Sequence, residues 1–282
     1  MSIEARYRGL FAFLMNHKEL WFSSILQNWP ESRKAFPESW LQWVSTLSQE
    51  AQRAFGDEQT VPSIPSDLAD FLTLCGSHCV LEQLTEEWSL DILDAQGLNL
   101  KKQHEIQRLL PLLKTEAPNI WHAVDIGGGM GHLARLCVKT FGWTFHSIDK
   151  DAVLQDKGRW WLKRSRGLDR DKLTFVNADF SNQPLPEVDS LFAQPECLSL
   201  GLHTCGGLAL NQFQKSLAST LLINFGCCYD KMQLKAEADT EGEKSSDLNQ
   251  SVVARDLQLP WSQSALFLAT RSRKGMTREE FA

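Results

Sequence analysis

Long apolar runs are missing from this 282-residue sequence. No stretch reaches the roughly 18 uninterrupted apolar residues that a membrane-spanning helix requires, although hydrophobic residues make up 43% of the chain. The opening residues also lack the apolar core and the small-residue cleavage site of a secretory signal. We therefore expect a soluble, cytoplasmic protein that has no membrane partner.

The sequence also lacks the features of a disulfide-stabilised protein and of a generally basic one. Its seven cysteines are an odd number in a long chain, which favours reduced thiols over a disulfide framework. The formal net charge is −6, so basic residues do not cover the whole surface. A local basic stripe remains compatible with RNA as a partner.

Strand-like runs of Val, Ile and Thr are absent from the first part of the chain. From Tyr7 to about Lys114 the apolar residues recur at helical spacing. The segment Pro62–Pro65 interrupts this pattern before a further helix that should begin near Ser66. We expect residues 1–118 to form an all-helical N-terminal domain whose tryptophans fill its core.

After residue 118, short apolar runs alternate with amphipathic stretches, as in β-α-β units with a parallel sheet. The expected strands are His122–Ile126, Thr144–Asp149, Leu173–Ala178, Leu198–His203 and Leu221–Phe225. The expected helices are Gly131–Phe141, Ala152–Ser165 and Leu208–Leu217. This order predicts an α/β fold with a Rossmann-like, doubly wound sheet over residues 119–234. Residues 235–282 should form a polar loop and a C-terminal segment.

The clearest motif joins the first expected strand to its helix. Asp125 stands near the end of the strand, and the glycines that follow include Gly127, Gly129 and Gly131. Glycine permits positive φ and lets a ligand lie directly against the backbone. The last glycine of a dinucleotide fingerprint is missing, because His132 occupies its place. The pattern is instead Asp-x-Gly-x-Gly-x-Gly, in which Asp125 can bind the ammonium group of S-adenosylmethionine (SAM).

Carboxylates also end the next two expected strands. Asp149 lies about the distance downstream at which an acid accepts hydrogen bonds from ribose hydroxyls. Asp179 can accept a hydrogen bond from the adenine amino group, and the ring of Phe180 can face the base. Ligands of open parallel sheets gather at the carboxyl ends of the strands. Three acids in successive units therefore predict a SAM site rather than three isolated turn formers.

The fourth and fifth expected strands end in residues that can take part in chemistry. His203 and Cys205 follow the fourth strand, and the pair Cys227-Cys228 precedes Tyr229 after the fifth. In this fold the fourth strand lies beside the first, so its end should border the methyl group of the cofactor. We take His203, Cys205 and Tyr229 as candidate catalytic residues, with His203 orienting or deprotonating the acceptor.

Together these motifs resemble a known family. Asp-x-Gly-x-Gly-x-Gly, His-Thr-Cys-Gly and Gly-Cys-Cys-Tyr-Asp-Lys-Met are similar to eukaryotic methyltransferase-like proteins described as containing an rRNA adenine dimethylase domain. The Lys-Lys-x-His-Glu segment at 101–105 and the Pro-x-Ser-Gln stretch at 260–263 extend the resemblance from about Leu98 to Ser264. More distantly, His-x-Cys-Gly with Cys-Cys resembles the acceptor-stem tRNA 2′-O-methyltransferases. The resemblance implies a class I, SAM-dependent methyltransferase that acts on RNA.

Two departures limit what this resemblance implies. The Asn/Asp-Pro-Pro-Tyr/Phe pattern of amino-group methylation is absent from the fourth strand end, so these residues do not support the dimethylase activity. The residues after the polar loop are too few for the usual final helix and strand hairpin. We therefore expect the sheet to lack its last strands.

The cysteines allow three interpretations. Cys205 or the Cys227-Cys228 pair can act as a nucleophile in carbon methylation, or can simply be small packing residues. His203 and these thiols also include the ligand types of a metal site, but the paired spacing of zinc modules is missing. We expect no metal, and we expect transfer by direct attack of a substrate oxygen or nitrogen on the methyl group.

The function has alternatives as well. A methyltransferase that acts on protein and a non-catalytic interaction module both fit the same fold. Asp125 and Asp149 favour an enzyme over the module, because a retired cofactor site need not keep its acids. Basic residues and two tryptophans between Lys157 and Arg166 fit either an RNA contact or a solvated helix face.

Overall fold

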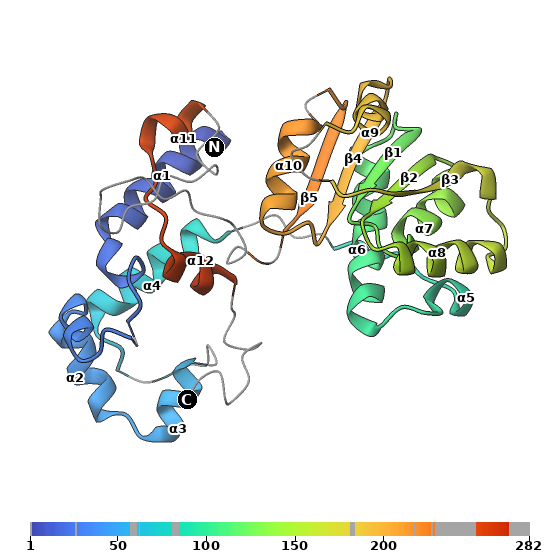
Figure 1. Cartoon of the computed structure of the whole chain (residues 1–282). Helices are drawn as coiled ribbons and strands as arrows, with labels where there is room; N and C mark the ends of the chain where they lie inside the picture. The colour runs from blue at the N-terminus through green and yellow to red at the C-terminus, as the bar shows by residue number, and fades with distance from the viewer. Residues whose placement is uncertain are drawn as a thin grey trace. The chain divides into compact units, whose positions relative to one another are not determined.

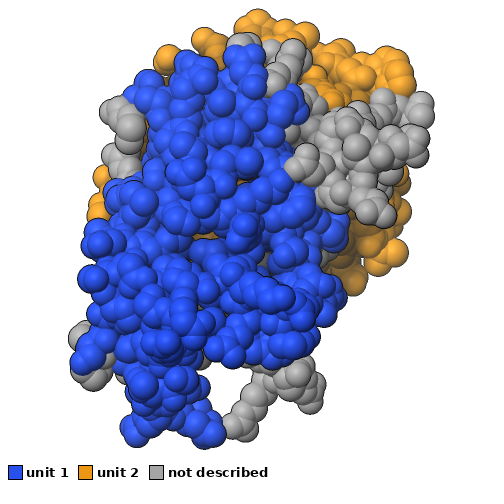
Figure 2. Space-filling view, turned by 90° about the vertical axis from the view of Figure 1, so that its left-hand side faces the viewer, with its two compact units in different colours: residues 1–82, 232–282 blue, residues 83–231 orange. Residues whose placement is uncertain are grey.

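The computed structural model describes residues 2–25, 27–56, 61, 63–80, 85–180, 184–216, 218–226, 228 and 252–270. They fall into two compact units, which Figure 2 colours separately. Unit 1 comprises Met1–Glu82 and Met232–Ala282, and unit 2 comprises Gln83–Lys231. Within the described ranges, every helix is too short or too polar to cross a bilayer.

Unit 1 is built from short helices (Figure 1). They are α1 (Ile3–Asn16), η1 (Lys18–Leu20), η2 (Glu31–Ala35), α2 (Glu38–Thr46), α3 (Gln49–Gly56), α4 (Ser66–His78), α11 (Val252–Leu257) and α12 (Gln263–Thr270). The start of α4 at Ser66 is as predicted. Trp43, Val61 and Leu68 form a small buried core, so Trp43 has the packing role expected of tryptophans here, whereas Trp29 is exposed. Helix α11 packs against α1, which brings the C-terminal segment back to the first helix.

Unit 2 contains a parallel sheet of five strands in the order β3-β2-β1-β4-β5. The strands are β1 (His122–Ile126), β2 (Thr144–Asp149), β3 (Leu173–Asn177), β4 (Cys197–Leu202) and β5 (Leu221–Phe225). The helices are α5 (Ile92–Ala95), α6 (Leu100–Glu116), α7 (His132–Phe141), α8 (Ala152–Arg164), η3 (Arg170–Lys172), α9 (Pro186–Asp189), η4 (Ser190–Ala193) and α10 (Gly207–Lys215). This confirms the predicted Rossmann-like α/β fold. The polar loop predicted after residue 235 lies outside the described residues.

Helices cover both faces of the sheet (Figure 1). On one face, α6 and α7 bury Leu110, Leu136 and Phe145 in the larger core. On the other, η4 and the end of α9 bury Phe192 against Val124 with other strand residues. Because successive residues of a strand point to opposite faces, both cores draw on the same strands, and β1 is buried along its whole length. A strand buried on both faces holds its carboxyl end, and the loop that follows, in a fixed position.

The boundary of the units differs from the one that the sequence predicts at residue 118. Helix α6 precedes that point, yet Ile106, Leu110 and Leu113 are at most 2% exposed in the core of the sheet. The division therefore falls after Glu82, and α5 and α6 belong with unit 2. Helical periodicity showed that α6 is a helix, but a helix that covers a sheet has the same pattern as one in a bundle.

Candidate active site

The loop between β1 and α7 is shaped by glycines. Gly127, Gly129 and Gly131 have φ values of 69°, 55° and 63°, a left-handed conformation that glycine adopts without steric cost. The N–H groups of Gly127 and Gly128 both donate to the carbonyl oxygen of Ile148, at 2.9 and 3.1 Å. The loop is thus tied to the end of β2 and presents its backbone at the carboxyl edge of the sheet.

Gly128 is required for a different reason. A Cβ atom at this position would overlap the hydroxyl of Ser147 and lie 2.6 Å from the Oδ2 atom of Asp125. Real Cβ atoms do not approach a neighbour this closely. The close packing of loop backbone against Ser147 and Asp125 therefore excludes every side chain at position 128.

Asp149 at the end of β2 fixes the same loop from the side. Its Oδ2 atom accepts the N–H of Gly129 at 2.8 Å, and its Oδ1 atom accepts the N–H of Asp151 at 2.9 Å. Gln155 on α8 adds a bond from its Nε2 atom to the carbonyl oxygen of Gly129, at 3.0 Å. A carboxylate has about four acceptor positions, so Asp149 can hold the loop and still accept ribose hydroxyls.

Asp125 is a buried carboxyl group at the base of the loop. It is 3% exposed. Burial, and then the negative charge of Asp149, raise the pKa of Asp125 to about 7. Both effects disfavour the charged form, so a positively charged group bound beside Asp125 would favour its ionisation. The ammonium group of SAM is such a partner.

These residues line one cleft of about 250 Å³ at the carboxyl edge of the sheet. Among the predicted site residues it brings together Asp125, Gly127, Gly129, Asp149 and His203. It also includes three residues from α6 and the turn before it, namely Leu98, Lys102 and Ile106. The prediction missed these three. The Lys-Lys-x-His-Glu segment was the signal that pointed to this helix.

His203, the residue after β4, lies between this cleft and a second cavity. Its φ of 66° places it in the left-handed region, and its N–H donates to the carbonyl oxygen of Phe225 at 2.9 Å. Its Nε2 atom lies 2.9 Å from the Oε2 atom of Glu105 on α6. His203 and Leu202 line both the cleft and a cavity of about 350 Å³ between α6 and the ends of β4 and β5.

A buried polar network holds the strand ends in place. Thr204 and Asn224 both bond the side chain of Gln212 on α10, with the Asn224 Nδ2 atom 2.6 Å from the Gln212 Oε1 atom. The Gln212 Nε2 atom donates to the hydroxyl of Ser199 at 3.2 Å, and this hydroxyl donates to that of Ser216 at 2.7 Å. Because a buried polar group is costly when it lacks a partner, this network fixes β4 against β5 and with them His203.

Residues 101–235, just under half of the chain, match the family model described as a methyltransferase domain. This segment is a methyltransferase domain. The match confirms the predicted class, a methyltransferase, for this part of the chain. It covers the glycine loop, the acids at the ends of β1 and β2, and His203.

Solved methyltransferase structures are also similar to the chain. The glycopeptide N-methyltransferase MtfA with sinefungin is 14% identical, with a TM-score of 0.32 over 42% of this chain and 52% of that one. A putative sarcosine dimethylglycine methyltransferase from Galdieria sulphuraria is 15% identical (TM-score 0.31; 49% of each chain). Coclaurine N-methyltransferase bound to N-methylheliamine and S-adenosylhomocysteine (SAH) is 16% identical (TM-score 0.33; 67% and 58%). The match thus spans about half the length of these structures.

Three predicted cofactor residues of the methyltransferase domain do not line the cleft. Phe180 is 4% exposed and packs its ring against Phe192, with centroids 5.9 Å apart, so the prediction that this ring faces adenine does not fit its position. Strand β3 ends at Asn177, and Phe180 lies in the core on the same side as Val176 and Ala178, away from the cleft. Asp179 beside it is exposed. Gly131 begins α7 in a left-handed conformation and packs against the ring of Phe175.

The cysteines stand apart from the cleft of the domain. Cys205 and Cys228 are half-buried, and neither lines the cleft or the cavity beside His203. Tyr229 and Cys227 lie outside the described residues. In the part of the chain that the structure describes, no three His, Cys, Asp or Glu side chains are grouped as metal ligands are.

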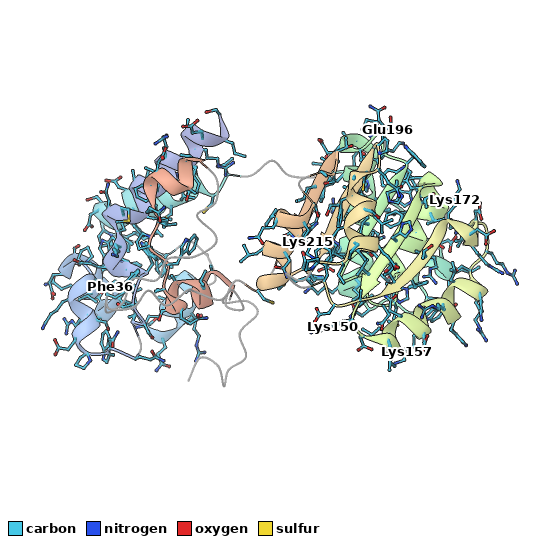
Figure 3. The ribbon with its side chains drawn as sticks, turned by 45° about the horizontal axis from the view of Figure 1, so that its top comes forward. Phe36, Lys150, Lys157, Lys172, Glu196 and Lys215 are labelled. Atoms are coloured by element: carbon cyan, nitrogen blue, oxygen red, sulfur yellow. The ribbon has the colours of Figure 1, made fainter. Side chains whose placement is uncertain are left out.

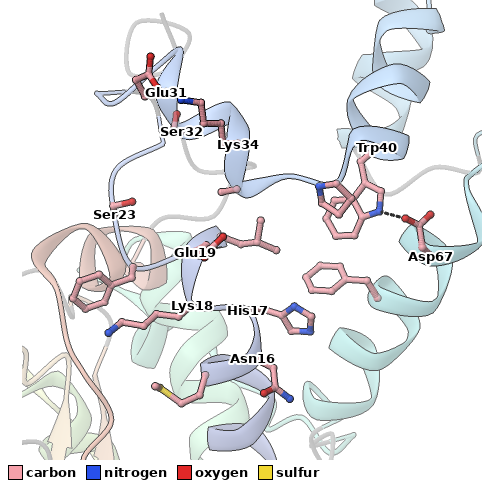
Figure 4. A pocket seen from close by; sticks show the side chains of 16 residues that line it. Asn16, His17, Lys18, Glu19, Ser23, Glu31, Ser32, Lys34, Trp40 and Asp67 are labelled. Carbon is pink, nitrogen blue, oxygen red and sulfur yellow. Dashed lines mark hydrogen bonds and ion pairs between the residues drawn. The ribbon is translucent and has the colours of Figure 1, made fainter.

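Unit 1 has a larger cavity of its own, of about 700 Å³ (Figure 4). Its polar groups bond one another: the Trp40 Nε1 atom donates to the Asp67 Oδ2 atom at 3.0 Å, and the Lys34 Nζ atom pairs with Glu31 at 2.5 Å. It has neither a glycine loop nor a buried acid. Size alone does not indicate a catalytic site, and we place the active site in the cleft of the methyltransferase domain.

Proposed function

We propose that this protein is a SAM-dependent methyltransferase that acts on RNA by direct methyl transfer. The observation that carries the proposal is the cleft in which Asp125, the glycine loop, Asp149 and His203 meet. The glycine loop that lines the cleft and the buried acid at Asp125 fit a ligand that lies against the backbone and carries a positive charge. NAD offers no such cation at this position.

The cofactor supplies an activated methyl group, and the protein positions the acceptor. Alignment of reacting groups can lower the activation barrier by roughly 7–11 kcal/mol, so the domain needs little acid or base chemistry. His203 is the titratable side chain shared by the cleft and the neighbouring cavity. It is suited to orient the acceptor or to take its proton. Cys205, Cys228 and Tyr229 have no assigned step in this scheme.

The choice of RNA is supported by the composition of one segment of the domain. Between Lys157 and Lys172, two of the residues labelled in Figure 3, the chain has seven Lys and Arg residues and only two Asp, although its net charge is −6. Trp160 is 48% exposed, and the Arg164 guanidinium lies 3.6 Å from the centre of its ring. A hollow of about 480 Å³ beside them is also lined by Arg135, Arg166 and other residues. We call Lys157–Lys172 the basic aromatic face.

Exposed aromatic rings among basic residues are the usual binding surface for single-stranded nucleic acid. The sequence resemblance to proteins with an rRNA adenine dimethylase domain and to tRNA 2′-O-methyltransferases points to the same substrate class. The specific RNA and the methylated atom are not part of the proposal, because the amino-group methylation pattern is absent.

Titration calorimetry tests the cofactor. We expect the full chain to bind SAH and not NADH, and Asp149→Ala to weaken SAH binding by about 1–3 kcal/mol, the range for a charged acceptor that loses its donors. Asp156→Ala, an exposed acid on α8, is the matched control and should change nothing. Tight NADH binding without a response to SAH would overturn the cofactor assignment.

Transfer of a labelled methyl group from SAM tests the substrate. Total RNA and total protein from the source cells are offered separately to the full chain. Label in RNA is the expected result. Label only in protein would replace RNA by the alternative substrate class, and SAH binding with no transfer to either would identify a non-catalytic interaction module.

A further inference from the structure

The cavity beside His203 shares a wall with the cofactor cleft. Leu202 and His203 line both spaces. They lie at the end of β4, which pairs with β1, the strand that leads into the glycine loop. The second cavity therefore adjoins the cleft at these two residues, one of which is His203.

The walls of this cavity are mainly apolar. Leu109, Leu202 and Phe225 contribute hydrocarbon surface, and the Phe225 ring is 39% exposed at the end of β5. The volume of about 350 Å³ falls at the lower end of the range for small-molecule sites, roughly 300–1,000 Å³. A flat ring can stack on an exposed phenylalanine. The shape and surface therefore fit a planar, largely apolar group.

The charged groups of the cavity disfavour an anion. Glu105 places a carboxylate on the wall. The Arg108 side chain pairs with Glu87 at 3.4 Å and donates to the carbonyl oxygen of Thr85 at 3.2 Å, so its charge is already compensated. Because Arg108 is paired with Glu87 and Glu105 with Lys101, these side chains give a phosphate no net attraction into the cavity. Of the parts of an RNA chain, a nucleobase fits and the backbone does not.

Glu105 also fixes the ring of His203. The hydrogen bond between Glu105 Oε2 and His203 Nε2 is 2.9 Å long, and Lys101 lies 3.7 Å from the other carboxylate oxygen. Helix α6 is itself held by the buried residues Ile106 and Leu110 next to Glu105. Because a carboxylate can only accept, the bond assigns the proton to Nε2 and sets the ring plane. The ring thus has one orientation on the wall between the two spaces.

We propose that this space, the acceptor cavity, receives an unstacked nucleobase of the RNA substrate, and that Glu105 is the positioning residue that holds His203 beside it. The proposal rests on the proposed function and adds where the substrate enters. An RNA base must leave its stack to reach a cavity of this kind. The phosphates then stay outside, where the acidic wall does not face them.

Three substitutions, at Phe225 and Glu105, separate the parts of the proposal. Phe225→Ala removes the stacking ring but keeps the carbonyl that accepts from His203, so the KM for RNA should rise about 10-fold, as for a lost base–aromatic contact. Glu105→Ala frees the ring of His203 but keeps the imidazole, so kcat should fall about 10- to 100-fold, less than the roughly 100- to 10,000-fold that loss of an acid–base group itself costs. Glu105→Gln keeps an acceptor for Nε2 and should restore most of kcat.

The controls lie on α6, the helix of Glu105, and on α10, the helix that precedes β5. Phe213→Ala removes an exposed ring from α10, and Glu116→Gln changes an exposed acid at the end of α6. Both should leave kcat and KM unchanged. SAH affinity and the thermal midpoint should be unchanged in all five variants. A purely structural role of Glu105 predicts instead a lower midpoint and no rescue by Gln, which would overturn the positioning assignment.

A cross-link map tests the cavity without turnover. RNA that carries 4-thiouridine is irradiated with the full chain, and the adducts are located by mass spectrometry. We expect adducts at Phe225 or Leu109, and loss of these adducts in Phe225→Ala. Adducts confined to other surfaces, or no RNA binding, would overturn the acceptor cavity. Failure to bind SAH, or RNA cross-links without methyl transfer, would instead count against the proposed function.

Discussion

The chemistry of the site depends on a few side chains whose surroundings change their behaviour. Asp125 is the clearest case, because burial and the neighbouring Asp149 raise its pKa to about 7. Near neutral pH a small change in pH therefore changes its charge. The same residue in water would stay ionised down to about pH 4.

This gives a prediction for the pH dependence of binding. The charged carboxylate attracts the ammonium group of the ligand, and it is present above the raised pKa and lost as the pH falls through 7. SAH affinity should therefore rise between pH 6 and pH 8. Asp125→Asn should lower affinity at pH 8 by about 10-fold or more, the scale of a charged hydrogen bond, and should flatten the profile. Calorimetry across this range checks both, and equal slopes for the two proteins would contradict the assignment.

The stability of the protein without ligand should change in the opposite direction. The pKa of Asp125 is higher in the folded state than its ordinary value of 3.8, so the folded protein holds the proton more tightly. This contribution to stability is present at low pH and is lost as the pH rises through about 7. Asp125→Asn should therefore raise the thermal midpoint at pH 8 more than at pH 5. Thermal unfolding of the ligand-free proteins measures it.

The strand-end residues make a separate prediction about mechanism. His203→Ala should lower turnover on RNA about 100-fold or more, within the range for a general base, whereas Cys205→Ser and Cys228→Ser should retain most of it. Because His203 has a φ of 66°, His203→Asn is a useful second variant, since asparagine tolerates this conformation. A covalent adduct with 5-fluoropyrimidine RNA that either Cys→Ser change abolishes would establish thiolate catalysis instead.

At the scale of the elements, the loop between β1 and α7 determines whether a cofactor site exists. Its backbone is bonded to Ile148 and Asp149 and packs against Ser147. Two separate requirements meet here. Positions 127, 129 and 131 require glycine because their φ angles are positive. Position 128 requires it because there is no space for a Cβ atom.

Gly128→Ala tests the second requirement. The added methyl group would overlap Ser147 and press on Asp125, and we expect SAH binding to be lost and stability to fall by about 1–3 kcal/mol, as in other overpacked sites. Gly207→Ala is the matched control, because nothing lies within 4 Å of its Cβ position. Thermal unfolding with and without SAH reports both effects. Normal binding by Gly128→Ala would show that the loop can move away from β2.

On the scale of the whole molecule, charge is distributed unevenly. The chain as a whole is acidic, with a formal charge of −6, but the basic aromatic face collects seven of its 29 Lys and Arg residues within 16 positions. A local excess of this kind governs association with a polyanion even when the net charge is negative.

Trp160→Ala should weaken binding of single-stranded RNA by about 1–3 kcal/mol if a base stacks on this ring. Trp121 is the matched control, because it is 51% exposed in the same unit but lies outside the Lys157–Lys172 segment. Fluorescence titration at several salt concentrations is the measurement. Arg166→Glu, which reverses a charge, should also make the affinity for RNA less dependent on salt concentration. Equal losses for the two tryptophan variants would argue against the basic aromatic face.

The sequence by itself determined the sheet and the start of the cofactor site. Strands β1, β2 and β5 were predicted to the residue, and β3 and β4 to within one residue of each end, because short apolar runs with glycine punctuation define such strands. The acids and the glycines that lead into the loop were found for the same reason. They stand at or just after the ends of predicted strands, and the carboxyl ends of parallel strands lie at the same edge of the sheet.

Only the tertiary structure decided which distant parts belong to the site. Glu105 bonds His203 across 98 positions of sequence, and α6 joined the sheet rather than the helices before it. Phe180 packed into the core, away from the cleft. In each case the local pattern allowed more than one partner, and the choice depended on which buried surface was available after the sheet had formed.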